Sequence, residues 1–269
     1  MTKIPVFFIY CGFLLCLMAC NAPTERLLAT AKQFGMQSVE LNAEGFVLSC
    51  FYQPGIVGGR VLHIYLEGDG RPWQNGLLPA AEPTTRASLM LPLMAMDSSP
   101  ALYLGRPCYN GHANDAGCKP NLWTSARYGE QVLGSMTVGI KEFVNRYGYN
   151  ELVLIGHSGG GSLAMLLSSR VPNTKHLLTL SGNYDINLWA DYHGYQHLSE
   201  SENPADYVNN GALEWHYMGA EDSNIPPKLF MHLLESRANS RVEVLSGVSH
   251  QQGWLVYWAE ILSRLEGSH

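Results

Sequence analysis

The sequence predicts an α/β protein with a mostly parallel central sheet and helices on both faces of that sheet. Short apolar segments rich in β-branched residues alternate with longer segments of helical spacing, which is the pattern of strands joined by crossover helices. Polar residues stand directly after several of these strands, where the active sites of such sheets form. With 269 residues, the chain is long enough for one large domain with a full core.

Composition and charge exclude several classes of protein. Hydrophobic residues make up 46% of the chain and charged residues 15%, which is typical of a globular protein and not of a disordered one. The formal net charge of −6 and the absence of a basic run argue against nucleic acid as the partner. No spacing of His and Cys typical of zinc sites occurs, so no metal ion is expected.

The first residues have the features of a targeting segment. Lys3 supplies a positive charge, residues 4–19 are almost wholly apolar, and the segment ends in Leu17-Met18-Ala19-Cys20. The apolar stretch is short for a membrane span but has the length of a signal-peptide core. Its end resembles the lipobox of bacterial lipoproteins, although Met18 stands where that pattern prefers a small residue or Val.

This resemblance implies removal of a signal peptide over residues 1–19 and acyl chains on Cys20 as the anchor to the membrane. Residues 20–37 are then the lipidated N-terminus and tether, and residues 38–269 are the folded domain. The expected location is the bacterial cell envelope, facing the periplasm or the exterior. The alternative is an ordinary secretory signal and a soluble secreted protein.

Four cysteines remain after the leader, at positions 20, 50, 108 and 118. An exported protein lies in a compartment where disulfides form. Cys108 and Cys118 share a loop rich in Gly, Asn and Pro, and are the candidate pair for a disulfide. If Cys20 carries acyl chains, Cys50 is left without a partner and is expected to be a buried free thiol.

In the first half of the chain, strands are expected where apolar and β-branched residues run together, and helices where apolar residues recur every three or four positions. The expected elements are two antiparallel strands within 37–53, a core strand over 61–66, a helix over 84–96 with a break near Pro92, a strand over 100–104, a long loop over 105–122 and a helix over 125–147.

The second half repeats the alternation of strand and helix once the excursion over residues 182–210 is set aside. That excursion is rich in Trp, Tyr and His, and it forms either a small cap over the sheet edge or an ordinary surface loop. The other expected elements are a strand over 152–155, a helix that ends before Pro172, a strand over 175–181, a strand over 213–218, a helix over 227–238, a strand over 241–245 and a helix over 251–265.

The strand over 152–155 runs into Gly156-His157-Ser158-Gly159-Gly160, which fits the pattern G-x-S-x-G. A serine on a sharp turn between a strand and a helix is a nucleophile elbow. A side chain at Gly156 or Gly160 would clash with the neighbouring strand or helix. Because five residues match such a pattern fairly often by chance, the strand before it and the helix after it strengthen the prediction.

Two further polar residues follow strands in a matching order. Asp222 follows the strand over 213–218 and His250 follows the last strand, so both should reach the sheet edge of Ser158. A serine hydroxyl is a poor nucleophile until a base takes its proton, and imidazole titrates near working pH. We therefore predict Ser158 as nucleophile, His250 as base and Asp222 as the acid that orients it. Asp185 also follows a strand and is the alternative acid.

The order Ser, Asp, His resembles that of α/β-hydrolase-fold serine hydrolases of the esterase and lipase type, over about residues 40–266. Gly219-Ala220-Glu221-Asp222-Ser223-Asn224-Ile225-Pro226 is similar to the acid loop of that family. Glu67-Gly68-Asp69-Gly70 and Gly105-Arg106-Pro107-Cys108 resemble a group of envelope hydrolases without a known substrate. The resemblance implies the α/β-hydrolase fold and no organic cofactor.

The resemblance also implies an oxyanion hole formed by the backbone N–H groups of Gly159 and Asp69, with Gly70 as an alternative donor. Glu67 stands where the family usually has a histidine. The carboxylate of Asp69 is expected to point away, because a negative charge near a developing oxyanion would oppose catalysis.

The implied activity is hydrolysis of a carboxylic ester of a small molecule through an acyl-enzyme on Ser158. Trp73, Trp123 and His193 are the candidates for contact with the substrate. A peptidase or a thioesterase would use the same residues, so the fold does not choose among these reactions. The alternative from another class is a non-catalytic lipoprotein that serves as a binding module, and the complete triad argues against it.

Overall fold

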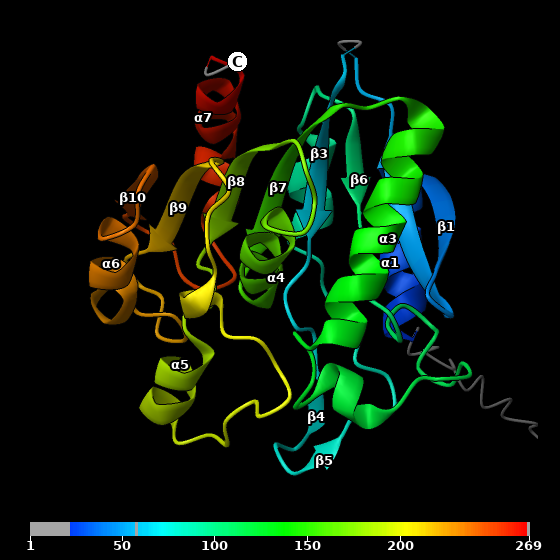
Figure 1. The fold of residues 1–269 in the computed structure, drawn as a ribbon, viewed down its shortest axis with the longest axis horizontal. Helices are drawn as coiled ribbons and strands as arrows, with labels where there is room; N and C mark the ends of the chain where they lie inside the picture. The colour runs from blue at the N-terminus through cyan, green and yellow to red at the C-terminus, as the bar shows by residue number, and fades with distance from the viewer. Residues whose placement is uncertain (1–21, 57–58, 268–269) are drawn as a thin grey trace, which may run out of the picture.

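The computed structural model describes residues 22–56 and 59–267, and an eight-stranded sheet lies at its centre in the order β1-β2-β6-β3-β7-β8-β9-β10 (Figure 1). The strands are β1 (Gln37–Ala43), β2 (Phe46–Gln53), β3 (Val61–Leu66), β6 (Ala101–Tyr103), β7 (Glu151–His157), β8 (Thr174–Leu180), β9 (Leu213–Gly219) and β10 (Ser240–Leu245), and a separate hairpin contains β4 (Trp73–Gln74) and β5 (Leu78–Pro79). The helices are α1 (Pro23–Gln33), α2 (Met90–Ala95), α3 (Glu130–Tyr147), α4 (Gly159–Ser168), α5 (Ile186–His193), α6 (Pro227–Glu235) and α7 (Trp254–Glu266), with short 3-10 helices at Pro120–Trp123 and Pro204–Asp206.

The sheet is mostly parallel, as the sequence predicts. β1 pairs antiparallel with β2, and β2 pairs antiparallel with β6. From β6 through β3, β7, β8 and β9 to β10, every neighbouring pair runs parallel. The central strands β3 and β7 are buried after their first residues, because helices cover both of their faces.

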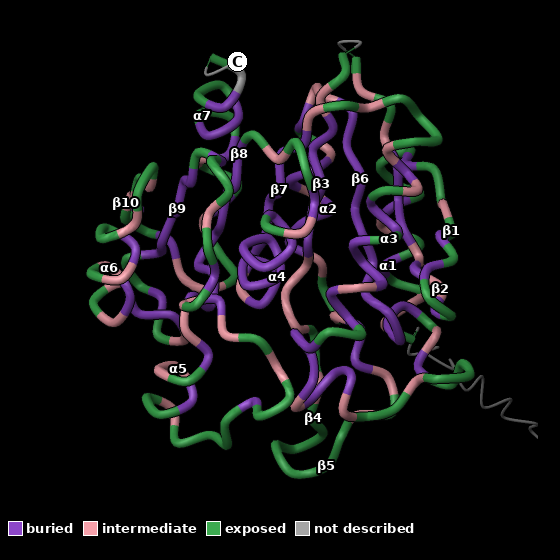
Figure 2. The backbone as a smooth tube through the Cα atoms, viewed as in Figure 1, coloured by how far each residue is buried: buried purple, intermediate pink, exposed green. Residues whose placement is uncertain are grey.

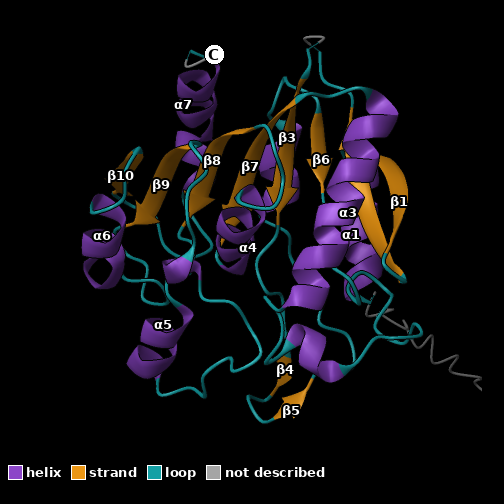
Figure 3. Ribbon diagram, in the orientation of Figure 1, coloured by secondary structure: helices purple, strands orange, loops and turns teal. Residues whose placement is uncertain are grey.

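Each face of the sheet has its own apolar core. The strands at the centre of the sheet are buried (Figure 2), and helices pack against it (Figure 3). On one face, α3, α4 and α6 contribute residues such as Met136, Leu163 and Phe230. On the other face, α1, α2 and α7 contribute residues such as Leu27 and Trp258. Helices on both faces of a parallel sheet place the functional edge at the carboxyl ends of the strands.

Two predicted helices begin later than expected because their first residues have other partners. The helix expected over 84–96 forms only at Met90–Ala95; before it, the side chains of Thr84 and Ser88 donate hydrogen bonds to Glu82 and Glu67. The helix expected over 125–147 begins at Glu130. Residues 125–129 form a turn instead, in which the N–H of Tyr128 donates to Ser201 Oγ over 3.1 Å.

The N-terminal region differs from the expected tether. Residues 23–33 form helix α1, and Leu27 and Ala31 are buried against the domain, so the described domain includes residues before position 38. The predicted leader and the lipidation site Cys20 lie outside the described residues. In the part of the chain that is described, no helix is both long and apolar enough to cross a bilayer.

The predicted disulfide is present. Cys108 and Cys118 are bonded, with their Cα atoms 5.5 Å apart, and they close the loop that follows β6. Cys50 is a buried free thiol within β2, and burial raises its pKa to about 12. It is therefore protonated and unreactive at neutral pH.

Two segments extend beyond the carboxyl edge of the sheet, the β4–β5 hairpin and helix α5 (Figure 1). The hairpin was not predicted, and it follows β3 directly in the chain. Helix α5 forms within the excursion over 182–210, where Asp185 caps its first turn by accepting from the N–H groups of Asn187 and Leu188.

Candidate active site

Ser158 sits on a sharp turn between β7 and α4. Its backbone angles, φ 54° and ψ −122°, lie in a region that residues with side chains rarely adopt. The turn closes only because its neighbours lack side chains: a Cβ on Gly156 would come within 2.1 Å of the Gly160 carbonyl oxygen, and one on Gly160 within 2.0 Å of the Leu66 carbonyl oxygen. The strained turn holds the Ser158 hydroxyl at the edge of the sheet.

A chain of hydrogen bonds joins the three predicted residues. The Ser158 hydroxyl lies 3.0 Å from Nε2 of His250, and Nδ1 of His250 lies 2.8 Å from Oδ2 of Asp222. Nδ1–H donates to the carboxylate, which leaves Nε2 as the acceptor for the serine proton. The residues predicted as base, orienting acid and nucleophile are therefore brought together from the ends of β10, β9 and β7.

Asp222 is held as a charged acceptor. Its Oδ1 accepts from the N–H groups of Asn224 and Ile225, both over 2.8 Å. Burial works to raise the pKa of Asp222, but the hydrogen bond and charge of His250 and the bond from Ile225 outweigh it and lower the pKa below its usual value. The alternative acid, Asp185, bonds to the first turn of α5 and to Asn203 and makes no contact with His250.

Two contacts to His250 were not predicted. Nδ2 of Asn224 donates to Nε2 of His250 over 3.1 Å, the same atom that faces Ser158. Nε2–H of His157 donates to the backbone carbonyl of His250 over 2.7 Å. His157 was singled out only as a residue inside the elbow, and its contact with a loop 93 positions away carries no local sequence signal.

His157 is buried in its neutral form. Its Nδ1 has no hydrogen-bond partner among the described residues. Burial and then the nearby charge of His250 lower its pKa from 6.5 to about 3. A proton on this ring would place a charge in the apolar floor of the elbow.

We expect this histidine to make stability depend on pH. The unfolded chain binds a proton at His157 near pH 6.5, whereas the folded chain does so only near pH 3. The unfolded state therefore holds more protons in that window, and the free energy of unfolding should fall by about 1.4 kcal/mol per pH unit on acidification. Urea unfolding between pH 7 and pH 4 measures this slope. In His157→Gln, which keeps an N–H donor but does not titrate, the slope should decrease, and an unchanged slope would contradict the assignment.

The loop after β3 lies directly on the elbow. A Cβ on Gly68 would be 3.5 Å from Cβ of Ser158, which places the backbone of this loop in direct contact with the elbow. The backbone N–H of Asp69 donates to no described residue. It and the N–H of Gly159 are the predicted oxyanion donors, and both belong to segments that touch Ser158.

The carboxylate of Asp69 was expected to point away from the elbow, but it does not. A Cβ on Gly159 would come within 1.9 Å of Asp69 Oδ1. Nη1 of Arg106 and Nη1 of Arg127 each lie 2.9 Å from one carboxylate oxygen, and the Tyr128 hydroxyl lies 2.8 and 2.7 Å from the two oxygens. Two guanidinium groups therefore compensate the negative charge that lies beside the predicted oxyanion hole.

These partners also fix the charge state of Asp69. Burial favours its neutral form, but Arg127 and then Arg106 outweigh burial, so the pKa of Asp69 is lowered from its usual value. Arg106 and Arg127 are themselves buried, with 5% and 4% of their surfaces exposed. Arg106 lies in a segment that the sequence singled out, but nothing local indicates its partner.

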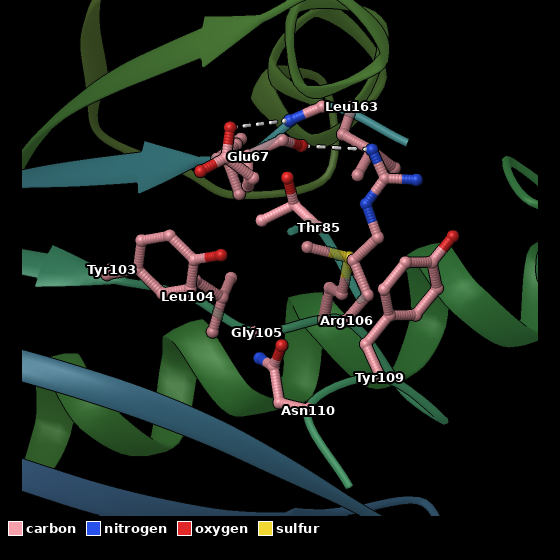
Figure 4. Close-up of a pocket in the computed structure, with 12 residues that line it drawn as sticks. Glu67, Thr85, Tyr103, Leu104, Gly105, Arg106, Tyr109, Asn110 and Leu163 are labelled. Carbon is pink, nitrogen blue, oxygen red and sulfur yellow. Dashed lines mark hydrogen bonds between the residues drawn. The ribbon is translucent and has the colours of Figure 1, made fainter. Parts of the chain in front are cut away.

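Glu67, at the position of the usual histidine, anchors the other side of the loop. Its Oε1 accepts from the N–H of Gly68, and its Oε2 accepts from the Ser88 hydroxyl and the N–H of Met90. Burial raises the pKa of this carboxyl. Behind it is a pocket of about 10 Å³, where Nη2 of Arg106 donates to the Glu67 carbonyl over 3.1 Å (Figure 4). This pocket has room for about one water molecule, not for a substrate.

Ser158 and His250 open into a cleft of about 960 Å³. The loop after β3 and the β4–β5 hairpin form one wall, and the excursion after β8 forms another through residues such as Trp189 and Tyr195. Trp73, one of the predicted substrate contacts, lines this cleft.

Two of the predicted substrate contacts are wrong. Trp123 is buried in the core, with 3% of its surface exposed, and only the residues after it reach the cleft. His193 does not line the cleft, because its Nε2 donates to the Asn224 carbonyl over 2.9 Å and its ring stacks on Tyr195.

Within residues 22–56 and 59–267, no group of three metal-ligating side chains is found.

Comparison with known proteins identifies the fold. No family model and no curated protein sequence matches the chain. An esterase from Pyrococcus furiosus is similar in structure, with a TM-score of 0.63 at 16% identity over 87% of this chain and 90% of that one. A serine hydrolase from Cycloclasticus zankles has a TM-score of 0.60 at 13% identity, over 87% of this chain and 99% of that one.

An acylaminoacyl peptidase from Pyrococcus horikoshii is also similar, with a TM-score of 0.60 at 15% identity, over 85% of this chain and 40% of that one. These likenesses and the sheet order show that the chain has the α/β-hydrolase fold. The fold alone does not distinguish an esterase from a peptidase.

Proposed function

We propose that this protein is a serine hydrolase that cleaves carboxylic esters through an acyl-enzyme on Ser158. The observation that carries the proposal is the hydrogen-bonded chain from Ser158 through His250 to Asp222 beside an open cleft. The chain's resemblance in structure to esterases and other serine hydrolases supports the same reaction class.

The proposed mechanism follows from these contacts. Nε2 of His250 takes the proton of the Ser158 hydroxyl as Oγ attacks the ester carbonyl carbon, and Asp222 stabilises the imidazolium that forms. The N–H groups of Gly159 and Asp69 hold the oxyanion of the tetrahedral intermediate. His250 then protonates the departing alcohol, and a water molecule activated by the same base releases the acid from Ser158.

The main alternative within this reaction class is cleavage of amides or thioesters by the same residues. The likeness in structure to an acylaminoacyl peptidase is the reason to test peptidase activity as well. Parallel assays with an ester, a thioester and an anilide of the same acyl group discriminate among them, and the ester should give the highest kcat/KM. A binding module without catalysis would hydrolyse none of the three.

A fluorophosphonate probe tests the reaction class directly. The wild-type protein should form one covalent adduct, which peptide mass spectrometry maps to Ser158, because its hydroxyl lies 3.0 Å from Nε2 of His250 and opens into the cleft. Ser158→Ala should not react, whereas Ser223→Ala, at an exposed serine of the acid loop, should react like the wild type. Absence of labelling in the folded wild-type protein would refute the hydrolase proposal.

We also propose that the enzyme is anchored in the bacterial envelope by acyl chains on Cys20. The apolar leader and the lipobox-like residues before Cys20 support this proposal. The intact mass of the mature chain tests the proposal. We expect the mass of a chain that begins at Cys20 plus that of its acyl groups, whereas a chain without acyl groups would have a lower mass and would contradict the anchor.

A further inference from the structure

The cleft beside Ser158 is richer in cationic groups than the chain as a whole. The chain has a net charge of −6, yet Arg71 and Arg127 both line the cleft and Arg106 lies directly behind its wall. The carboxylates on the same wall are Asp69 and Glu67. Asp69 forms ion pairs with both Arg106 and Arg127. This group of three buried side chains therefore holds one more positive charge than negative.

The guanidinium of Arg127 has N–H groups without a hydrogen-bond partner among the described residues. Its Nε–H donates to the Thr124 carbonyl and its Nη1 to Asp69, both over 2.9 Å. Its Nη2 donates to no described residue, although the side chain is 95% buried, with a side-chain exposure of 5%. A guanidinium N–H without a partner beside a cleft fits an anionic oxygen there, because hydrogen bonds between charged groups are stronger than those between neutral groups.

Arg71 supplies the second cation of this wall. It is exposed, it lines the cleft, and its side chain makes no ion pair among the described residues. Its backbone is fixed, because its N–H donates to the Pro83 carbonyl over 2.7 Å and the preceding residue, Gly70, has a φ of +65°. The side chain therefore starts from a fixed point two residues after Asp69.

The other acidic groups near the cleft do not pair with Arg71 or Arg127. Glu67 is occupied by Ser88, Gly68 and Met90, and burial raises its pKa. On the opposite wall, Asp191 lies outside the cleft and pairs with His197 over 2.7 Å. Among the described residues, Glu67 is the carboxylate that lines the cleft without an ion pair, and its oxygens accept from these neutral donors.

We propose that the cleft is specific for esters that carry a carboxylate or similar anion close to the scissile bond, and that Arg71 and Arg127 bind that anion. This inference rests on the proposed hydrolase function and specifies its substrate class. An anion in the cleft would pair with Arg71 and accept from the free Nη2 of Arg127.

Matched pairs of esters test the proposal on each side of the scissile bond. For the acyl side, the pair is p-nitrophenyl hydrogen glutarate and p-nitrophenyl pentanoate, which have acyl chains of equal length. For the leaving group, the pair is 4-acetoxybenzoate and its methyl ester. Each kcat/KM is divided by the rate constant of that ester with hydroxide, so that intrinsic reactivity cancels.

In at least one pair the anionic ester should be preferred by about tenfold, as a charge-assisted contact provides. The preference should decrease when the ionic strength is raised from about 0.02 to about 0.5 M, because Arg71 is exposed. Arg71→Gln should lower the anionic-to-neutral ratio about fivefold. Arg60→Gln removes an equal charge at the opposite, amino end of β3 and should leave the ratio unchanged.

Equal kcat/KM values within both pairs, or an unchanged ratio in Arg71→Gln, would overturn the anion preference. In that case the neutral esters are still hydrolysed and the fluorophosphonate probe still labels Ser158. Failure of the proposed function looks different, because then no ester is hydrolysed and the probe does not react.

Discussion

Replacement of His250 by alanine is expected to lower kcat/KM for a p-nitrophenyl ester by about 10⁴-fold or more. The imidazole is the described group that can take the proton of Ser158, at 3.0 Å from the hydroxyl. Without it the serine remains a neutral, weak nucleophile, and the carboxylate of Asp222 has no imidazole ring to orient. Steady-state kinetics near neutral pH, with circular dichroism to verify the fold, measure the effect.

The matched control is His232→Ala, at an exposed histidine of α6. It should keep wild-type kcat/KM, because it is not part of the cleft. Full activity of His250→Ala would mean that another group accepts the serine proton and would contradict the proposed mechanism.

The second large effect is expected from Asp69→Asn. This substitution keeps the size of the side chain but removes the charge that compensates Arg106 and Arg127. Breaking a buried ion pair by removal of one partner costs about 3–5 kcal/mol, because the remaining charge is left uncompensated. For a domain of this length that corresponds to a decrease in Tm of about 6–20 °C. Thermal unfolding followed by circular dichroism measures it.

Two further variants test the cause of this loss. Adding Arg106→Met to Asp69→Asn removes the surplus charge, so the double variant should be more stable than Asp69→Asn alone. Glu142→Gln breaks an exposed pair with Arg146 on α3 and should cost at most about 1 kcal/mol. If Asp69→Asn were no less stable than Glu142→Gln, the ion pairs of Asp69 with Arg106 and Arg127 would not be a determinant of stability.

The sequence predicts those parts of the fold that depend on local patterns. The strand over 61–66 has the predicted bounds, because a run of buried apolar residues between turns leaves few alternatives. The three polar residues at strand ends were predicted to meet, because parallel strands bring their carboxyl ends to one edge. The short loop sequence around Cys108 and Cys118 was sufficient to predict their disulfide.

The features that were missed depend on contacts distant in sequence. The helices expected from residues 84 and 125 start later because their first residues bind the loop and the excursion around the cleft. Trp123 belongs to the core although it lies one residue from the cleft wall. The pairing of Asp69 with Arg106 and Arg127 spans 37 and 58 positions, and no local periodicity encodes it.

If the protein is anchored at Cys20, as proposed, the start of helix α1 at Pro23 would limit how far the domain can reach from the membrane. If Cys20 is acylated, as proposed, only Asn21 and Ala22 separate it from the first residue of α1. Such a span extends about 10 Å at most. Because Leu27 and Ala31 bury α1 against the sheet, the whole domain would move with the anchor and would stay within a thin layer at the lipid surface. Its turnover would then depend on the concentration of ester in that layer and not in the bulk solution.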